Sequence, residues 1–133
     1  MIQLSTPKNS RQVIPKSKTT AFVTTTGTVY TNNLTSGAFE QATGSTVEGQ
    51  ALYIANETIA AADNRSNVNV TVMSTEDRFL VDTVNAANVA HNGQRMLLDA
   101  TGAKANNTGT DAPTGVLIQV DTAGTNKIIA LKA

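Results

Sequence analysis

The clearest pattern of hydrophobic and polar positions lies at residues 67–73, where Val68, Val70 and Val72 alternate with polar residues. Successive side chains of a β-strand point to opposite faces of the sheet, so this alternation predicts a half-buried antiparallel strand. A shift of one residue in its pairing would bury the asparagines instead of the valines. We therefore expect the register of this strand to be well defined.

Short apolar runs separated by polar turns continue along the rest of the chain. These runs predict further strands, together with one helical turn at residues 86–90 and a hairpin or bulged strand around Gly27. Within residues 74–92, Ser74 could also begin a longer helix, but many of the residues there form helices poorly, which favours a strand. Residues 32–49 are predicted to be mostly loop. The predicted strands span residues 51–55, 78–82, 95–99, 115–120 and 126–131.

Two turns of the same form, Asp99–Gly102 and Asp121–Gly124, follow predicted strands. In each turn the aspartate can cap backbone amides and the glycine can adopt a positive φ. The second turn is predicted to join the last two strands into a hairpin.

This succession of short apolar runs and polar turns predicts a mainly β protein, a small β-barrel or β-sandwich with at most one or two short helices. The 133 residues are sufficient for one domain with its own core, which we place at residues 20–133. Residues 1–19 show no periodicity, and Pro7 and Pro15 favour extended backbone. We expect these residues to form an extended N-terminal arm that becomes ordered on contact with a partner.

The net charge of zero conceals an asymmetry between the two parts of the chain. Residues 1–39 carry a charge of +4 and no acidic residue, whereas residues 40–133 carry −4. A basic leading segment is typical of an arm that docks on an acidic surface, although a basic terminus without a partner has the same composition. The basic residues of the arm are Lys8, Arg11, Lys16 and Lys18.

Candidate chemistry is sparse in this sequence. There is no cysteine, and the one histidine, His91, has no second histidine or glutamate at a metal-binding spacing. Asp82 could pair with the acidic residues Glu76 and Asp77, but a solvated edge is the favoured interpretation. We expect no catalytic, cofactor-binding or metal-binding residues, and no cofactor.

Neither nucleic acid nor a membrane is expected as a partner. Single-stranded nucleic-acid sites combine basic residues with aromatic side chains, and here the five aromatics are not interleaved with the basic arm. The chain also lacks a run of roughly 20 apolar residues and the apolar core of a secretory signal. We expect synthesis in a cytoplasm.

The segment Arg95-Met-Leu-Leu-Asp-Ala-Thr-Gly, followed by Thr108-Gly-Thr-Asp-Ala-Pro-Thr and then Gly115-Val-Leu-Ile-Gln-Val, resembles the capsid decoration (cement) proteins of tailed phages, the lambda-type head decoration family. The resemblance covers about the last 40 residues and the layout of a polar arm before a β-rich body. It implies a β-tulip-like domain and a non-enzymatic function on the outer surface of a virion. Such proteins bind the major capsid protein as homotrimers and stabilise the head against internal pressure.

In such proteins the arm adds to strands of the capsid protein, a mode in which main-chain hydrogen bonds supply affinity. Two other functions fit the same sequence: another virion module, such as a head fibre or tail-associated β-domain, and a carbohydrate-binding β-module. The sparse aromatics disfavour the latter, because sugar sites use exposed rings. The residues predicted to contact the capsid are Ile2, Leu4, Lys8, Arg11, Val13, Ile14, Lys16 and Lys18.

Overall fold

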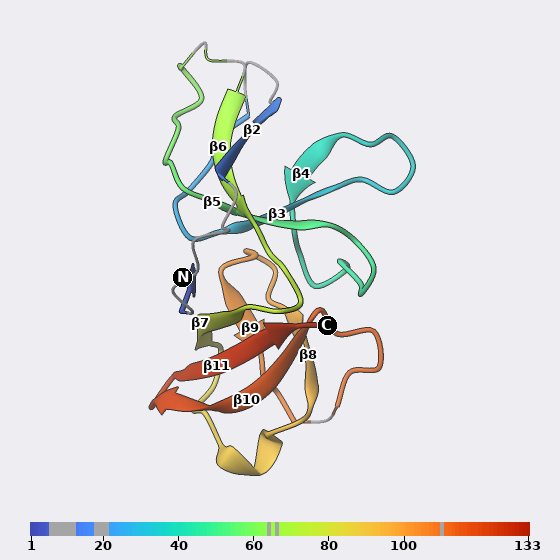
Figure 1. Cartoon of the computed structure of the whole chain (residues 1–133), viewed down its shortest axis with the longest axis vertical. Helices are drawn as coiled ribbons and strands as arrows, with labels where there is room; N and C mark the ends of the chain where they lie inside the picture. The colour runs from blue at the N-terminus through green and yellow to red at the C-terminus, as the bar shows by residue number, and fades with distance from the viewer. Residues whose placement is uncertain (6–12, 18–21, 64, 66, 110) are drawn as a thin grey trace.

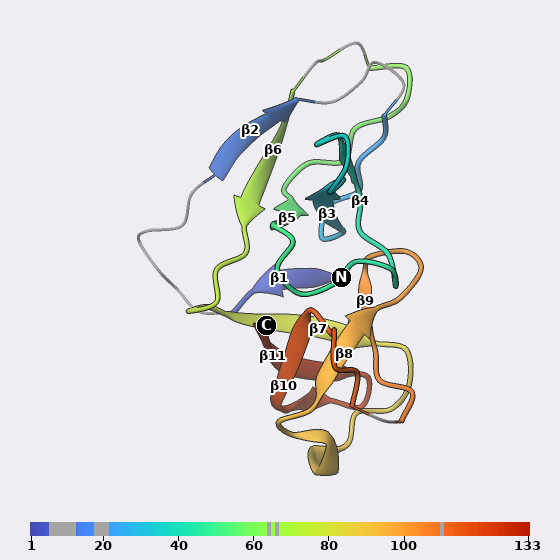
Figure 2. The same ribbon diagram turned by 90° about the vertical axis from the view of Figure 1, so that its right-hand side faces the viewer.

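The predicted mainly β fold is confirmed by the computed structural model, in which the described residues form eleven strands in two sheets and one short 3-10 turn (Figure 1). The structure describes residues 1–5, 13–17, 22–63, 65, 67–109 and 111–133. One sheet lies toward each end of the longest axis of the molecule, and β1 (Ile2–Leu4), a strand of the six-stranded sheet, lies on the side that faces the other sheet (Figure 2).

The first sheet has six strands, and part of it closes on itself. β9 pairs antiparallel with β8 and also parallel with β7, so the pairing runs in a closed circuit through β7, β11, β10, β8 and β9. Because β11 occupies one edge of β7, β1 and β9 share the other edge. The strands are, in sheet order, β1 (Ile2–Leu4), β7 (Arg78–Thr83), β11 (Lys127–Lys132), β10 (Leu117–Gly124), β8 (Arg95–Leu98) and β9 (Lys104–Asn106).

The second sheet has five strands, all antiparallel. It contains the strand predicted from the clearest alternation, β6, in which Val68 and Val70 are buried while Asn67 and Asn69 are exposed. The strand is confirmed, and the alternation holds from Asn67 to Val70, beyond which Thr71 is buried and Val72 is half-buried. The strands are, in sheet order, β2 (Val13–Ser17), β6 (Asn67–Val72), β5 (Leu52–Ala55), β3 (Val29–Asn32) and β4 (Phe39–Gln41).

The main hydrophobic core joins the two sheets. Leu52 and Ile54 of β5 belong to the same buried cluster as Phe79 of β7 and Ile128 of β11. Tyr53 points to the opposite face of β5 because it alternates with these two residues. On that face a second, smaller cluster forms with Ile59, Val68 and Val70. Both faces of β5 are therefore buried.

Backbone hydrogen bonds also link the two sheets, at the Asp99–Gly102 turn. The Val29 amide donates to the Gly102 carbonyl at 2.9 Å. Asp99 caps the turn as predicted, because its Oδ1 accepts hydrogen bonds from the Ala103 and Lys104 amides. Gly102 has a φ of +68°, the left-handed conformation that favours glycine.

The last hairpin is confirmed, but its turn differs from the prediction. Asp121–Gly124 belongs to β10, and the turn is formed by Thr125 and Asn126. Two register shifts, after Gln119 and after Thr122, carry β10 past the predicted end, since a bulge inserts an extra residue without ending the pairing.

Three other predictions needed correction. The helical turn expected at residues 86–90 is a 3-10 turn, η1 (Val89–His91), which begins after the capping residue Asn88. Gly27 lies in a tight turn before β3 and neither in a bulged strand nor in a hairpin, because Thr24 bridges Ile59 while β3 pairs with β5 and β4. The loop predicted at residues 32–49 contains β4, and β9 was not predicted at all. Both strands are three residues long, too short to show an alternating pattern.

Candidate functional site

Two of the residues predicted to contact a capsid, Ile2 and Leu4, belong to the protein's own fold. Ile2 is fully buried and Leu4 packs against the same core cluster. β1 pairs antiparallel with β7, and the Ile2 amide donates to the Gly27 carbonyl at 2.8 Å. The structure differs here from the expected free arm, because Ile2 supplies apolar surface that the core needs. In this conformation the Ile2 side chain is not available to a partner.

Three further arm residues, Val13, Ile14 and Lys16, lie in β2. This strand is the outermost one in the five-stranded sheet and pairs with β6 on one side. Among the residues that the structure describes, no strand pairs with its other edge, and such an edge offers main-chain donors and acceptors to an added strand. The remaining predicted contact residues lie outside the described residues: Lys8, Arg11 and Lys18.

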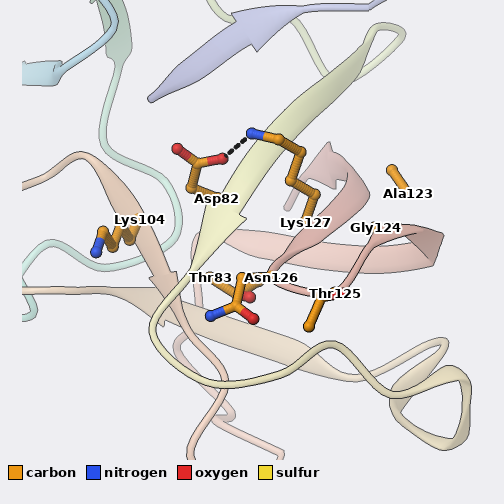
Figure 3. A pocket seen from close by; sticks show the side chains of 8 residues that line it. All are labelled: Asp82, Thr83, Lys104, Ala123, Gly124, Thr125, Asn126 and Lys127. Atoms are coloured by element: carbon orange, nitrogen blue, oxygen red, sulfur yellow. Dashed lines mark hydrogen bonds and ion pairs between the residues drawn. The ribbon is translucent and has the colours of Figure 1, made fainter.

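An open depression of about 450 Å³ lies where the end of β7 meets the β10–β11 turn (Figure 3). Asp82 of β7 accepts hydrogen bonds from the Lys127 ammonium group and from the Met1 amino group, the latter at 2.7 Å. Lys104 also lines the depression, and within the described part of the chain its ammonium group has no partner. The lining residues are Asp82, Thr83, Lys104, Ala123, Gly124, Thr125, Asn126 and Lys127.

The cationic partners of Asp82 determine its ionisation. The hydrogen bond from Lys127 is the largest cause that lowers the pKa of the Asp82 carboxyl, followed by the hydrogen bond from the Met1 amino group. The carboxylate is therefore charged at neutral pH and already bound to two cations. This arrangement is typical of a clamp that holds β7, the hairpin and the N-terminus together.

The acidic residues Glu76 and Asp77 do not meet Asp82. They precede β7, and the strand separates Asp77 from Asp82 by about 16 Å at roughly 3.3 Å per residue. His91 lies in η1. Across the described ranges, no three histidine, aspartate or glutamate side chains gather as a metal site requires.

Four aromatic side chains gather at the five-stranded sheet. Tyr30 and Phe39 are stacked with their ring centroids 5.3 Å apart, and Phe22 contacts both rings at 5.6 Å. Phe39 also approaches Tyr53, at 6.2 Å. Burial raises the pKa of Tyr30. The two tyrosine rings are buried, so they stabilise the sheet and do not form an exposed platform for sugars.

Two buried amide side chains were missed by the sequence analysis. Asn107 and Gln119 are almost fully buried, and each bonds to the loop that contains η1. Gln119 had a signal that could have revealed it, since it interrupts the apolar run Val116–Val120 at a position that faces inward. Asn107 lies in a polar stretch and had no such signal.

Compared with known proteins, the chain matches no family model, no curated protein and no solved structure. Among the described residues, no helix has the length and apolar character needed to cross a membrane.

Proposed function

We propose that this protein is a non-enzymatic capsid decoration protein that binds the major capsid protein on the outer surface of a phage head. It would act as a homotrimer and stabilise the shell against internal pressure. Two features support this proposal. The segment from Arg95 to Val120 resembles the lambda-type head decoration family, and the β-rich body ends in β2, whose outer edge pairs with no other strand in the described part of the chain.

The observation that carries the proposal is the position of β2. All five residues of β2 pair this part of the predicted arm with β6, from Val13 opposite Thr71 to Ser17 opposite Asn67. Its outer edge supports strand addition by a capsid segment, in which main-chain hydrogen bonds would extend the five-stranded sheet. The arm would therefore contribute to capsid binding through the outer edge of β2, while β1 holds the N-terminal segment on the body of the protein.

The basic residues in and around β2 favour an acidic binding surface on the capsid. Lys8, Arg11, Lys16 and Lys18 surround or lie within this strand in the sequence, and no acidic residue occurs before Glu40. Opposite charges on two surfaces increase the rate of association and suppress wrong partners. Binding should accordingly weaken as salt is added.

Reversal of these charges tests the proposal better than deletion, because deletion of residues 1–19 would remove two strands. A variant with K8E, R11E, K16E and K18E is mixed with undecorated heads and measured by co-sedimentation at low salt. We expect the variant to fold and to bind at least 10-fold more weakly than the wild type. The control variant with K104E and K132E changes basic residues of the body and should bind normally.

Unchanged binding by the folded arm variant would contradict the role of the basic segment. Failure of the wild type to bind heads would refute the decoration function itself. Electron microscopy of the virion provides a separate check: a protein confined to the tail or to a single vertex would support the alternative of a fibre or tail module.

A further inference from the structure

Asn92 and Gly93 form the one Asn-Gly pair of the sequence. They lie near the end of the loop at residues 84–94, which contains η1 and which Figures 1 and 2 show as the gold coil at the bottom. An asparagine followed by glycine is the pair most prone to deamidation, because glycine has no Cβ to hinder its amide nitrogen. Both residues are exposed, so water can reach them.

Deamidation at such a pair is an intramolecular reaction that needs no enzyme. The Gly93 nitrogen loses its proton and attacks the Asn92 Cγ, the bond from Cγ to the side-chain nitrogen breaks, and ammonia leaves. Water then opens the resulting five-membered succinimide ring and gives aspartate or isoaspartate. Ring closure requires the attacking nitrogen to lie close to Cγ in the correct orientation. Gly93 must therefore have a free N–H and a backbone turned toward the Asn92 side chain.

The folded backbone meets neither condition. The Gly93 N–H donates to the Gln119 carbonyl at 2.8 Å, and an amide proton held in this way is less easily removed. Asn92 has a ψ of 132°, an extended conformation that leaves the Gly93 nitrogen far out of the plane in which the ring would close. The Asn92 backbone must therefore rotate before attack, and this rotation breaks the hydrogen bond from Gly93.

The Gln119 side chain also holds the Asn92 side chain in place. Gln119 is 1% exposed, and its Nε2 donates to the Asn92 Oδ1 at 2.9 Å and to the Asn88 carbonyl at 2.8 Å. Its own backbone amide donates to the Gln94 carbonyl at 3.0 Å. A buried amide with several such bonds fixes the groups around it. One residue of β10 therefore restrains both the attacking nitrogen and the side chain that it would attack.

We infer that Asn92–Gly93 is a latent deamidation site, which Gln119 keeps unreacted while the loop at residues 84–94 is closed. The reaction proceeds through local opening of the loop, so its rate follows the population of the open state. Conversion makes the opening permanent. It adds a negative charge to a loop without aspartate, glutamate, lysine or arginine. Isoaspartate also lengthens the main chain by one carbon before Gly93, which moves its N–H away from the Gln119 carbonyl.

The test uses the purified protein alone, so it does not depend on binding to a phage head. Wild type, Q119M and Q41M are incubated at mildly alkaline pH, and peptide mapping by mass spectrometry measures deamidation at Asn92 over time. Methionine keeps the length of the glutamine side chain and removes its polar groups. Q41M is the matched control, because Gln41 is an exposed glutamine of β4 in the other sheet. The wild-type chain unfolded in urea gives the rate without protection.

Q119M must be folded, which circular dichroism verifies. If it does not fold, N88A takes its place, because Asn88 is exposed and caps η1 by accepting a hydrogen bond from the Ala90 amide. Loss of this cap loosens the same loop without disturbing the core.

We expect Asn92 to react at least about 100-fold more slowly in the folded wild type than in the unfolded chain. Loss of the Gln119 side chain should raise the rate in the folded protein about 10-fold, whereas Q41M should match the wild type. The inference is overturned if the folded wild type reacts as fast as the unfolded chain, or if the folded loop variant reacts no faster than the wild type. Equal acceleration in Q41M, or at Asn69 of β6 in Q119M, would also overturn it, because opening would then not be confined to the loop.

Discussion

At the scale of single residues, Gly102 packs closely against the backbone of Ala42 and of Val29 in β3. A Cβ at this position would lie 2.5 Å from the Ala42 carbonyl oxygen and 3.0 Å from that of Val29, in addition to requiring a φ of +68°. Gly102→Ala should therefore lower the free energy of unfolding by about 2 kcal/mol or more, the sum of left-handed strain and overpacking. Chemical denaturation measures this loss.

Gly37→Ala is the matched control for this prediction. Gly37 also has a positive φ, +72°, but nothing lies within 4 Å of its added Cβ. It should show only the conformational cost, about 1 kcal/mol. Equal losses for the two variants would mean that the contact with the Ala42 and Val29 carbonyls is easily relieved.

The Asp82 clamp predicts a dependence of stability on pH. Because Lys127 and the Met1 amino group lower the pKa of Asp82 in the folded protein, its stabilising contribution is present above the ordinary pKa of an aspartate. It is lost as the pH falls through the lower, folded value. Asp82→Asn should remove this part of the acid sensitivity, so its thermal midpoint should change less between pH 5 and pH 2. Asp121→Asn, at an exposed carboxylate of β10, should leave the acid sensitivity as in the wild type.

At the scale of elements, the loop at residues 84–94 should owe its order to the buried amides of Asn107 and Gln119. Asn107→Ala removes one acceptor and two donors and leaves polar backbone groups without partners, a loss of about 1–3 kcal/mol. Hydrogen exchange at residues 84–94 should accelerate at least 10-fold, while exchange in β10 and β11 changes less. The exposed neighbour Asn106 provides the control, and Asn106→Ala should leave the loop protected. A protected loop in Asn107→Ala would show that its order has another source.

Elements with long periodic patterns were predictable from the sequence, and short ones were not. The alternation at β6 fixed both its existence and its buried face, because one face packs on the second core cluster. β4 and β9 contain three residues each, and their pairing depends on strands distant in the sequence. The arm was equally hard to predict, because an isolated apolar residue such as Ile2 does not show in the sequence that its side chain is buried in the core.

The candidate sites followed the same rule. The basic charge of the arm could be read directly from its composition, but the open edge of β2 follows from the order of the strands in the sheet. The order of the loop at residues 84–94 depends on contacts between Asn107 and Asn85, and between Gln119 and Asn88, which are 22 and 31 residues apart in the sequence. Such long-range side-chain contacts leave no local pattern in a single sequence.

At the scale of the whole molecule, the shared core predicts that both sheets unfold together. The two tyrosines of the chain, Tyr30 and Tyr53, lie in the five-stranded sheet, so tyrosine fluorescence reports on that sheet. Hydrogen exchange in β7 and β11 reports on the other. The main cluster contains residues of both sheets, and a domain with one core unfolds in one cooperative transition. The two measurements should therefore give the same midpoint of denaturation.

Ile2→Ala tests the connection through β1. Ile2 is fully buried between the sheets, so its truncation should lower the free energy of unfolding by about 2–5 kcal/mol. The midpoints of denaturation reported by both probes should shift to lower denaturant concentration by the same amount, because β1 contacts β7 on one side and the Gly27 turn on the other. Leu34→Ala, at an exposed position, should change stability by less than about 0.5 kcal/mol. Separate midpoints for the two sheets in Ile2→Ala would instead show that they are independent units, with β1 stabilising only one of them.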